Sequence, residues 1–373
     1  MLAIMALAAH AALAADEPTA PVEVKDQPLI QIAVLLDTSN SMDGLIAQAK
    51  TQLWKIVNEF ATARKGGKIP RLQVALYEYG NDRLPREEGH IRMVLPLTDD
   101  LDKVSEELFA LTTNGGQEYC GMVIQKAAET LQWSGSSGDL KVIVIAGNEP
   151  FTQGPTDYRE ACKAALTKGI IVNTIHCGTS EEGVRGMWQD GAVRGEGTYS
   201  YIDQNRAVVH ISAPQDAELS RLNDELNTTY VPYGAQGKEG ADKQQAQDVN
   251  AASLAPSVAA QRAMAKASEQ YRNARWDLLD ALDAEAVKLE EIKDEDLPKE
   301  MQDMSMEQRA AYVQEQAQKR GEVQAQIQKL ADERKAYVAE QMKLQAAEGE
   351  ETFDEALIQS LSSQAQEKGF VIE

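Results

Sequence analysis

Between residues 29 and 233 the sequence alternates between short apolar runs and amphipathic segments, and this alternation constrains the fold most strongly. The first run, LIQIAVLLD, is almost continuously apolar, which is typical of a strand covered on both faces. Residues 45–65 follow, with Leu45, Leu53 and Phe60 on one side of a predicted helix. The pattern predicts an α/β fold with a doubly wound, mostly parallel sheet. Further strands are predicted at RLQVALYEYG, IRMVLPL, LKVIVIAG, IIVNTIHCG and TYSYID.

The rest of the chain has a different character. Residues 234–260 are rich in Gly, Gln, Ala, Asp and Ser with little periodicity, so we expect a linker between a domain at residues 28–233 and a helical region at residues 261–373. Two long antiparallel helices, folding back at Leu297-Pro298, are predicted in that region. Their apolar positions are Tyr271, Leu278, Leu282, Leu289 and Ile292 in the first helix, and Val323, Ile327, Leu330, Tyr337 and Leu344 in the second.

The second of these helices is expected to begin at a capping box formed by Ser305 and Gln308. Its heptad pattern is interrupted by Arg320, Arg334 and Gln341. We therefore expect a helical hairpin packed along a thin apolar seam, which resembles a coiled coil but is weaker than a parallel one.

The N-terminus and the net charge limit where the protein works and what it binds. The opening MLAIMALAAHAALAADE has a short apolar core and an Ala-Leu-Ala cleavage pattern, so residues 1–14 are expected to be a signal peptide. The protein would then be exported, to a periplasm or as a secreted protein. No other apolar run approaches the length of a membrane span. A net charge of −22 argues against nucleic acid and anionic membranes as partners.

The three cysteines and the histidines do not form a recognisable catalytic or zinc motif. Cys120, Cys162 and Cys177 have no CxxC spacing, and we expect buried thiols, with a Cys120–Cys177 bridge as an alternative. His90, His176 and His210 are not spaced for zinc or for a nucleophile–base pair, and a structural role is favoured for them. Two Gly-rich loops at residues 147–155 and 186–199 carry Phe151 and Trp188, which we expect at an exposed rim above the sheet.

Three oxygen-bearing side chains follow the first strand at every second position. They are Asp37, Ser39 and Ser41. Ligands bind beyond the carboxyl ends of the strands in open α/β sheets, and a carboxylate with two hydroxyls suits Mg²⁺ or Ca²⁺. The alternative is structural, because Asp and Ser also cap loops and helices routinely.

A D-x-S-x-S motif directly after a buried strand in an alternating α/β segment resembles the metal-ion-dependent adhesion site (MIDAS) of von Willebrand factor type A domains. The resemblance covers residues 28 to about 215. It implies a parallel sheet with one antiparallel edge strand, for which IRMVLPL is the candidate.

The sequence departs from this family at two site positions. The family supplies a threonine from a later loop, where the resemblance places Glu118 of this chain, and an aspartate after the fourth strand, where the chain has Gly147. Glu149 follows two residues on. The resemblance therefore implies a variant metal site of Asp37, Ser39, Ser41, Glu118 and Glu149, with a site that has lost its metal as the alternative.

Taken together, these features favour an exported binding module that uses a divalent metal, Mg²⁺ or Ca²⁺, to contact a protein partner. The helical region would be an arm for assembly or interaction. We do not expect an enzyme. A scaffold without metal is the main alternative, and a metal-dependent hydrolase is less favoured because the chain has no histidine ligand set or nucleophile motif.

Overall fold

The computed structural model describes residues 27–203, 210–345 and 353–372, so the signal peptide predicted at residues 1–14 lies outside the described residues. Six strands form one sheet in the order β3-β2-β1-β4-β5-β6. All neighbouring strands are parallel except β2 and β3, which confirms the predicted antiparallel edge strand. The strands are β1 (Leu29–Asp37), β2 (Arg71–Tyr79), β3 (Ile91–Thr98), β4 (Leu140–Gly147), β5 (Ile171–Cys177) and β6 (Glu196–Ile202).

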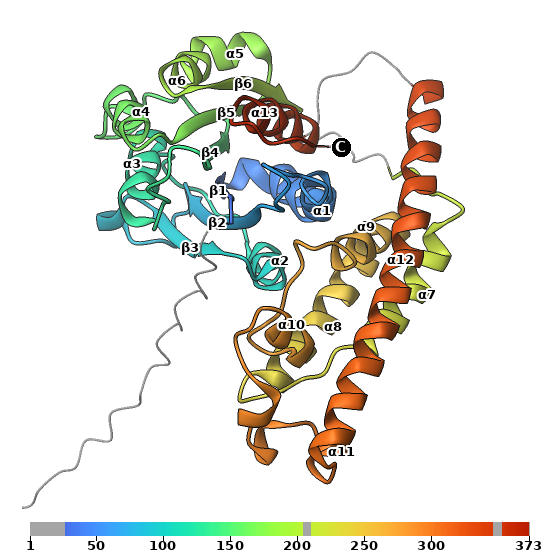
Figure 1. The fold of residues 1–373 in the computed structure, drawn as a ribbon. Coiled ribbons are helices and arrows are strands. Elements are labelled where there is room, and N and C mark those ends of the chain that lie inside the picture. Colours follow the sequence, from blue (N-terminus) through green and yellow to red (C-terminus); the bar gives the residue numbers. More distant parts are fainter. Residues whose placement is uncertain (1–26, 204–209, 346–352, 373) are drawn as a thin grey trace, which may run out of the picture.

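Helices cover both faces of the sheet, as the sequence predicts (Figure 1). One face carries α1 (Asp43–Glu59), α2 (Leu101–Ala110) and α13 (Phe353–Glu367). The other carries α3 (Cys120–Thr130), α4 (Tyr158–Thr167) and α6 (Trp188–Arg194), and the short helix α5 (Ser180–Arg185) precedes α6. The C-terminal helix α13 lies beside α1, although more than 290 positions separate them in the sequence.

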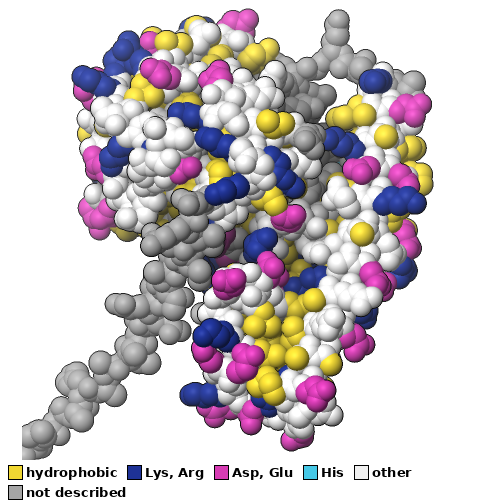
Figure 2. Space-filling view, in the orientation of Figure 1, with side chains coloured by type: hydrophobic (Ala, Val, Ile, Leu, Met, Phe, Trp, Pro, Cys, Tyr) yellow, Lys and Arg dark blue, Asp and Glu magenta, His cyan; other side chains and the backbone are white. Residues whose placement is uncertain are grey.

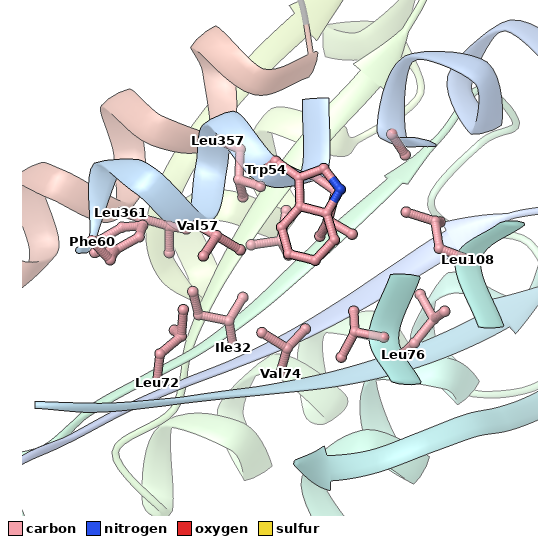
Figure 3. Packing of buried hydrophobic residues seen from close by; sticks show 14 of the residues in the cluster. Ile32, Trp54, Val57, Phe60, Leu72, Val74, Leu76, Leu108, Leu357 and Leu361 are labelled. Atoms are coloured by element: carbon pink, nitrogen blue, oxygen red, sulfur yellow. The ribbon is translucent and has the colours of Figure 1, made fainter. Parts of the chain in front are cut away.

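The apolar core between the sheet and its first helical face explains this return of the chain. Figure 3 shows Ile32, Val74 and Leu76 of the sheet beneath the side chains of α1 and α13. Leu357 and Leu361 of α13 are both buried in this cluster. Because the central strands β1 and β4 are buried on both faces, a helix is needed on each side, and α13 provides part of the cover on this one.

A helical region lies between β6 and α13 in the sequence, and its elements differ from the predicted linker and hairpin. The segment predicted to be a linker contains an 18-residue helix, α8. The first predicted long helix is broken into short pieces. The helices of the region are α7 (Asp216–Asn227), α8 (Gly237–Leu254), α9 (Pro256–Lys266), α10 (Leu278–Asp283), α11 (Lys299–Gln302) and α12 (Met306–Gln345), with 3₁₀ turns η3 (Leu289–Glu291) and η4 (Asp294–Asp296). The division of the chain into domains stays a prediction.

The second predicted long helix is present as α12, which is 40 residues long. It begins at the predicted capping box, where the Ser305 N–H donates to Gln308 Oε1 at 2.8 Å and the Gln308 N–H donates to Ser305 Oγ at 3.3 Å. It packs on α7 and α9 instead of on one long antiparallel partner. Val323 and Ile327 are buried in that contact.

The arginines that interrupt the seam of α12 are buried and paired. Arg320 Nη1 lies 2.7 Å from Asp277 and 3.1 Å from Asp280, and Arg334 Nε lies 2.6 Å from Asp216. These aspartates lie outside α12, so the heptad pattern of that helix alone could not reveal them. The seam of α12 therefore contains apolar side chains together with buried arginines, and each of these arginines is paired with an aspartate.

Candidate metal centre

Asp37 is the last residue of β1, and its side chain is completely buried. The Ser39 N–H donates to Asp37 Oδ1 at 2.8 Å, whereas Oδ2 has no hydrogen bond of good geometry among the described residues. The Ser39 and Ser41 hydroxyl oxygens lie 3.1 Å apart. Asn148, which follows the neighbouring strand β4, donates to Ser41 Oγ at 3.2 Å. One carboxylate, two hydroxyls and an amide therefore meet at the carboxyl ends of β1 and β4.

The structure also brings Glu118 to this site. It is 5% exposed and lies in the loop between α2 and α3. A Cβ added at Gly80 would lie 2.8 Å from Asp37 Oδ1 and 2.8 Å from Glu118 Cγ, so the two acidic side chains flank this glycine. The loop is fixed by the Asn114 N–H, which donates to the Thr38 carbonyl at 2.9 Å. Gly80 has φ +77°, and it allows the close approach because it lacks a side chain.

The pKa values of both carboxyls are raised, as expected where no positive charge stabilises the ionised forms. Burial raises the pKa of Asp37 to about 7, although the Ser39 and Asn148 N–H groups act in the opposite direction. Burial raises the pKa of Glu118 to about 8, with further contributions from the charges of Asp37 and Glu149. Two buried acids that repel each other are stabilised by a proton or by a cation.

Glu149 lies two residues beyond the end of β4. It is half-buried, and its charge acts on both Asp37 and Glu118. Its backbone carbonyl accepts a hydrogen bond from Trp188 Nε1 at 2.9 Å. Across the described ranges, no three His, Cys, Asp or Glu side chains are arranged to hold a metal. A role for Glu149 as a ligand stays a prediction, and in this structure it is an electrostatic neighbour.

Tyr79 is a residue of the site that sequence reasoning missed. Its hydroxyl donates to the Ala146 carbonyl at 2.9 Å and is fully buried. A Cβ added at Gly147 would clash with this hydroxyl and would lie 3.0 Å from Asp37 Oδ2. The space for an aspartate at position 147 is therefore filled by Tyr79. In the sequence, Tyr79 is one more large residue in a buried strand, and no local signal distinguishes it.

The donor set fits a hard divalent cation. Asp37 and Glu118 would supply two carboxylates, and Ser39 and Ser41 would supply hydroxyls. Asp37 Oδ2 is a buried oxygen that has no hydrogen bond of good geometry among the described residues. Mg²⁺ and Ca²⁺ prefer oxygen ligands of these types, and two negative charges neutralise such an ion. The loop geometry is equally that of a capping turn, because the Ser39 N–H is satisfied by Asp37.

The structure decides two further expectations, one about the aromatic side chains of the Gly-rich loops and one about the cysteines. Phe151 and Trp188 are both 0% exposed, with ring centroids 4.8 Å apart, so they belong to the core and not to an exposed rim. The aromatic rings fill the space between α4, α6 and the sheet because large apolar side chains gain most from burial. Cys120, Cys162 and Cys177 are buried free thiols, and the alternative Cys120–Cys177 bridge is not formed.

Comparison with known protein families identifies the segment that forms the sheet. Residues 31–207 match the sequence profile of the von Willebrand factor type A domain. This segment is a von Willebrand factor type A domain. The matched segment ends before α7, so the helical region is not covered by it. No curated protein sequence matches the chain.

Several solved structures resemble part of the chain at low sequence identity. A conserved hypothetical protein, BatB from Bacteroides thetaiotaomicron, is 21% identical over 47% of this chain and 90% of its own, with a TM-score of 0.36. The SpRpn10 VWA domain is 17% identical over 49% of this chain and 100% of its own, with a TM-score of 0.35. Proximal thread matrix protein 1 from the mussel byssus, solved with zinc in its MIDAS motif, is 15% identical over 48% of this chain and 43% of its own, with a TM-score of 0.37. Similarity this weak carries no functional argument.

The domain type narrows the range of functions. Von Willebrand factor type A domains often mediate protein interactions, are generally not enzymes, and commonly bind a divalent metal at the MIDAS. In the part of the chain that the structure describes, no helix combines the length and apolar character that crossing a membrane requires.

Proposed function

We propose that the protein is an exported protein-binding module. Its type A domain holds a divalent cation, Mg²⁺ or Ca²⁺, with Asp37, Ser39, Ser41 and Glu118, and presents that ion to a protein partner. The observation that carries the proposal is the pairing of two buried carboxylates around Gly80, one of them with an oxygen that has no hydrogen bond of good geometry among the described residues. Export rests on the predicted signal peptide.

The charges of the site define what this chain contributes. Asp37 and Glu118 neutralise a divalent ion, whereas a site built mainly from hydroxyls leaves more of the ion's charge for an acidic partner. This variant centre should therefore attract acidic ligands less strongly and accept neutral oxygen ligands relatively better. Glu149 adds a third negative charge nearby and acts in the same direction.

The helical region offers a second surface for interaction. Figure 2 shows hydrophobic side chains gathered at the surface over α10 and the segment that follows it. Leu282, Val287 and Ile292 in that segment are only partly buried. This supports a role of the helical region in assembly or partner binding, as an arm beside the type A domain.

A metal-free scaffold is the second candidate function. It is favoured by the hydrogen bond from the Ser39 N–H to Asp37 Oδ1, because that bond forms a stable turn without any ion. In this case the two carboxyls would share a proton, and the helical region would carry the interaction.

Calorimetric titration of the purified protein with Mg²⁺ and Ca²⁺ separates the two functions. Saturable binding that is lost in Asp37→Ala is the expected result. Glu160→Ala is the matched control, because Glu160 is an exposed acid on α4. Binding that is absent in the unmodified protein, or unchanged in Asp37→Ala, would leave only the scaffold.

A further inference from the structure

The hydrophobic surface over α10 and the segment that follows it has a composition that restricts what can bind there (Figure 2). We call it the α10 patch and define it by Leu282, Val287 and Ile292, which are partly buried and pack on a buried apolar cluster beneath them. Apolar surface that is contiguous and rimmed by polar groups is typical of protein interaction sites.

The segment that carries the patch is fixed from below. Residues 284–305 contain only the short turns η3 and η4 and the four-residue helix α11. However, Leu289, Leu297 and Met301 are buried in one cluster with α10. Arg309 of α12, which is 6% exposed, donates to the Met301 and Gln302 carbonyls at 3.1 and 3.0 Å. The α10 patch is therefore a preformed surface, and a partner that binds there loses little affinity to ordering this segment.

Acidic side chains surround the patch. Residues 283–307 contain ten Asp and Glu and three Lys, a net charge of −7, which is nearly a third of the −22 of all 373 residues. Figure 2 shows Asp and Glu side chains on several sides of the apolar surface. The negative charge is thus concentrated at this segment well beyond the average of the chain.

The lysines of the segment do not neutralise this rim. Lys288 is paired with Glu291 at 2.9 Å, and Lys293 lies 3.6 Å from Glu295. Glu285 and Glu290 are exposed and form no ion pair with a Lys or Arg of the described chain. They lie two positions before Val287 and Ile292, so unpaired negative charge flanks the apolar side chains in the sequence.

The apolar surface and its rim together select one class of partner. The apolar side chains gain from contact with apolar groups, and the acidic rim attracts basic groups at the edge of the contact. A second copy of this chain, docked through the same surface, would bring two acidic rims together. An anionic membrane or nucleic acid would be repelled as well. A helix with one apolar face flanked by Lys or Arg matches both parts of the surface.

We propose that the α10 patch binds a basic amphipathic helix of a protein partner. The apolar face of that helix packs on Leu282, Val287 and Ile292, and its basic side chains lie against the acidic rim. The proposal rests on the role in partner binding proposed above for the helical region, and it adds the chemistry of the partner. It needs no metal, so the type A site and the α10 patch make separate contacts.

The test uses the full protein and three fluorescent synthetic peptides of equal length. The first has Leu at helical spacing along one face and Lys at the other positions. The second has Glu in place of every Lys. The third has the composition of the first in an order that spreads the Leu residues around the helix. Fluorescence anisotropy should show saturable binding of the first peptide, with an affinity at least about tenfold above that of the other two.

Paired charge variants separate the α10 patch from the general acidity of the protein. Glu285→Gln combined with Glu290→Gln removes two exposed charges beside the patch and should weaken binding of the first peptide several-fold. Glu129→Gln combined with Glu160→Gln removes the same charge from exposed positions on α3 and α4 and should change it little. Equal weakening by the two double variants would overturn the proposal.

A second pair of variants tests the apolar contact. Val287→Ser should weaken binding of the first peptide, whereas Val193→Ser, at a 69% exposed position on α6, should not. Binding of the acidic or the reordered peptide as tight as that of the first would contradict the proposal. Each titration is run with chelator and with Mg²⁺. Peptide binding without Mg²⁺ binding contradicts only the metal function, and Mg²⁺ binding without peptide binding contradicts only the α10 patch.

Discussion

Tyr79 and Gly147 exclude an acidic side chain from the end of β4. Introducing the aspartate that the family carries, as Gly147→Asp, should not improve the site, because the new Cβ meets the Tyr79 hydroxyl and lies 3.0 Å from Asp37 Oδ2. We expect a loss of about 1–3 kcal/mol in the free energy of unfolding, typical of overpacking, and no gain in Mg²⁺ affinity. Gly135→Asp is the control, since a Cβ there meets nothing within 4 Å. Urea denaturation of both variants measures the difference, and equal stabilities would contradict the steric argument.

Glu118 is the residue that makes this metal site a variant. Glu118→Gln keeps the shape of the side chain but removes one of the two charges near Gly80. We expect Mg²⁺ affinity to fall by at least as much as in Ser39→Ala, because a charged ligand holds a divalent ion more strongly than a hydroxyl. Calorimetric titration of both variants provides the comparison. Unchanged affinity in Glu118→Gln would show that Glu118 is not a ligand.

The site was partly predictable at the level of single residues. Asp37, Ser39 and Ser41 follow a pattern with a physical meaning, and the position of Glu118 followed from the family resemblance. Tyr79 was not predictable, because its role depends on its hydroxyl facing the end of a strand that is far away in the sequence.

At the scale of elements, α13 is the helix that ties the C-terminus to the sheet. This helix makes polar as well as apolar contacts with the sheet. Its residue Gln364 exchanges two hydrogen bonds with Asn173 of β5, at 2.9 and 2.7 Å. Without α13, the buried side chain of Asn173 would lose both of its hydrogen bonds to Gln364. The helix therefore pairs a buried polar side chain and also covers apolar side chains of the sheet.

Truncating α13 should therefore destabilise the sheet. Leu361 is 0% exposed in the same cluster as Ile32 and Phe60, so Leu361→Ala is expected to lower the free energy of unfolding by about 2–5 kcal/mol. Gln359→Ala tests the same helix at an exposed position and should change stability little. Chemical denaturation measures both. A small effect of Leu361→Ala, equal to that of Gln359→Ala, would mean that α13 is not docked on the sheet in solution.

The elements that sequence reasoning missed share a physical cause. The strands and the helices that cover them were predictable because their apolar periodicity is local. Helix α8 was not, since its buried positions include Gln244 and Gln247, which are satisfied by Tyr271 and Ser105 from other elements. The docking site of α13 was not predictable either, because its partners lie in the first part of the chain.

At the scale of the whole molecule, a buried ionic network joins the helical region to the type A domain. Arg262 of α9 pairs with Asp248 of α8 and with Asp102 of α2, the latter at 2.7 Å. Its guanidinium also lies 4.5 Å from the ring centroid of Trp54 in α1. Lys266 Nζ completes the network at 2.9 Å from Asp248. Helices of both regions therefore share one set of charges, and the network should make their unfolding cooperative.

The network predicts a specific loss of stability in acid. Burial raises the pKa of Asp248, but Arg262, Lys266 and the amides of Asn223 and Asn227 outweigh it and hold the pKa well below its usual 3.8. At pH values between this lowered folded-state pKa and 3.8, the folded protein therefore binds fewer protons at Asp248 than the unfolded chain does. The stabilisation by Asp248 is complete above pH 3.8 and is lost as the pH falls toward the lower folded-state pKa.

Asp248→Asn tests this reasoning. At pH 7 it leaves Arg262 and Lys266 with uncompensated buried charge, so we expect a loss of about 3–5 kcal/mol in the free energy of unfolding. The difference from the unmodified protein should narrow steadily below pH 4, because Asp248 takes up a proton in the unfolded chain at a higher pH than in the folded protein. Asp242→Asn on the same helix is the control, since the Asp242 side chain is 62% exposed, and it should show little effect at any pH. Denaturation curves at pH 7, 4 and 2.5 measure the three proteins, and a difference that stays constant across them would show that Asp248 does not carry the acid sensitivity.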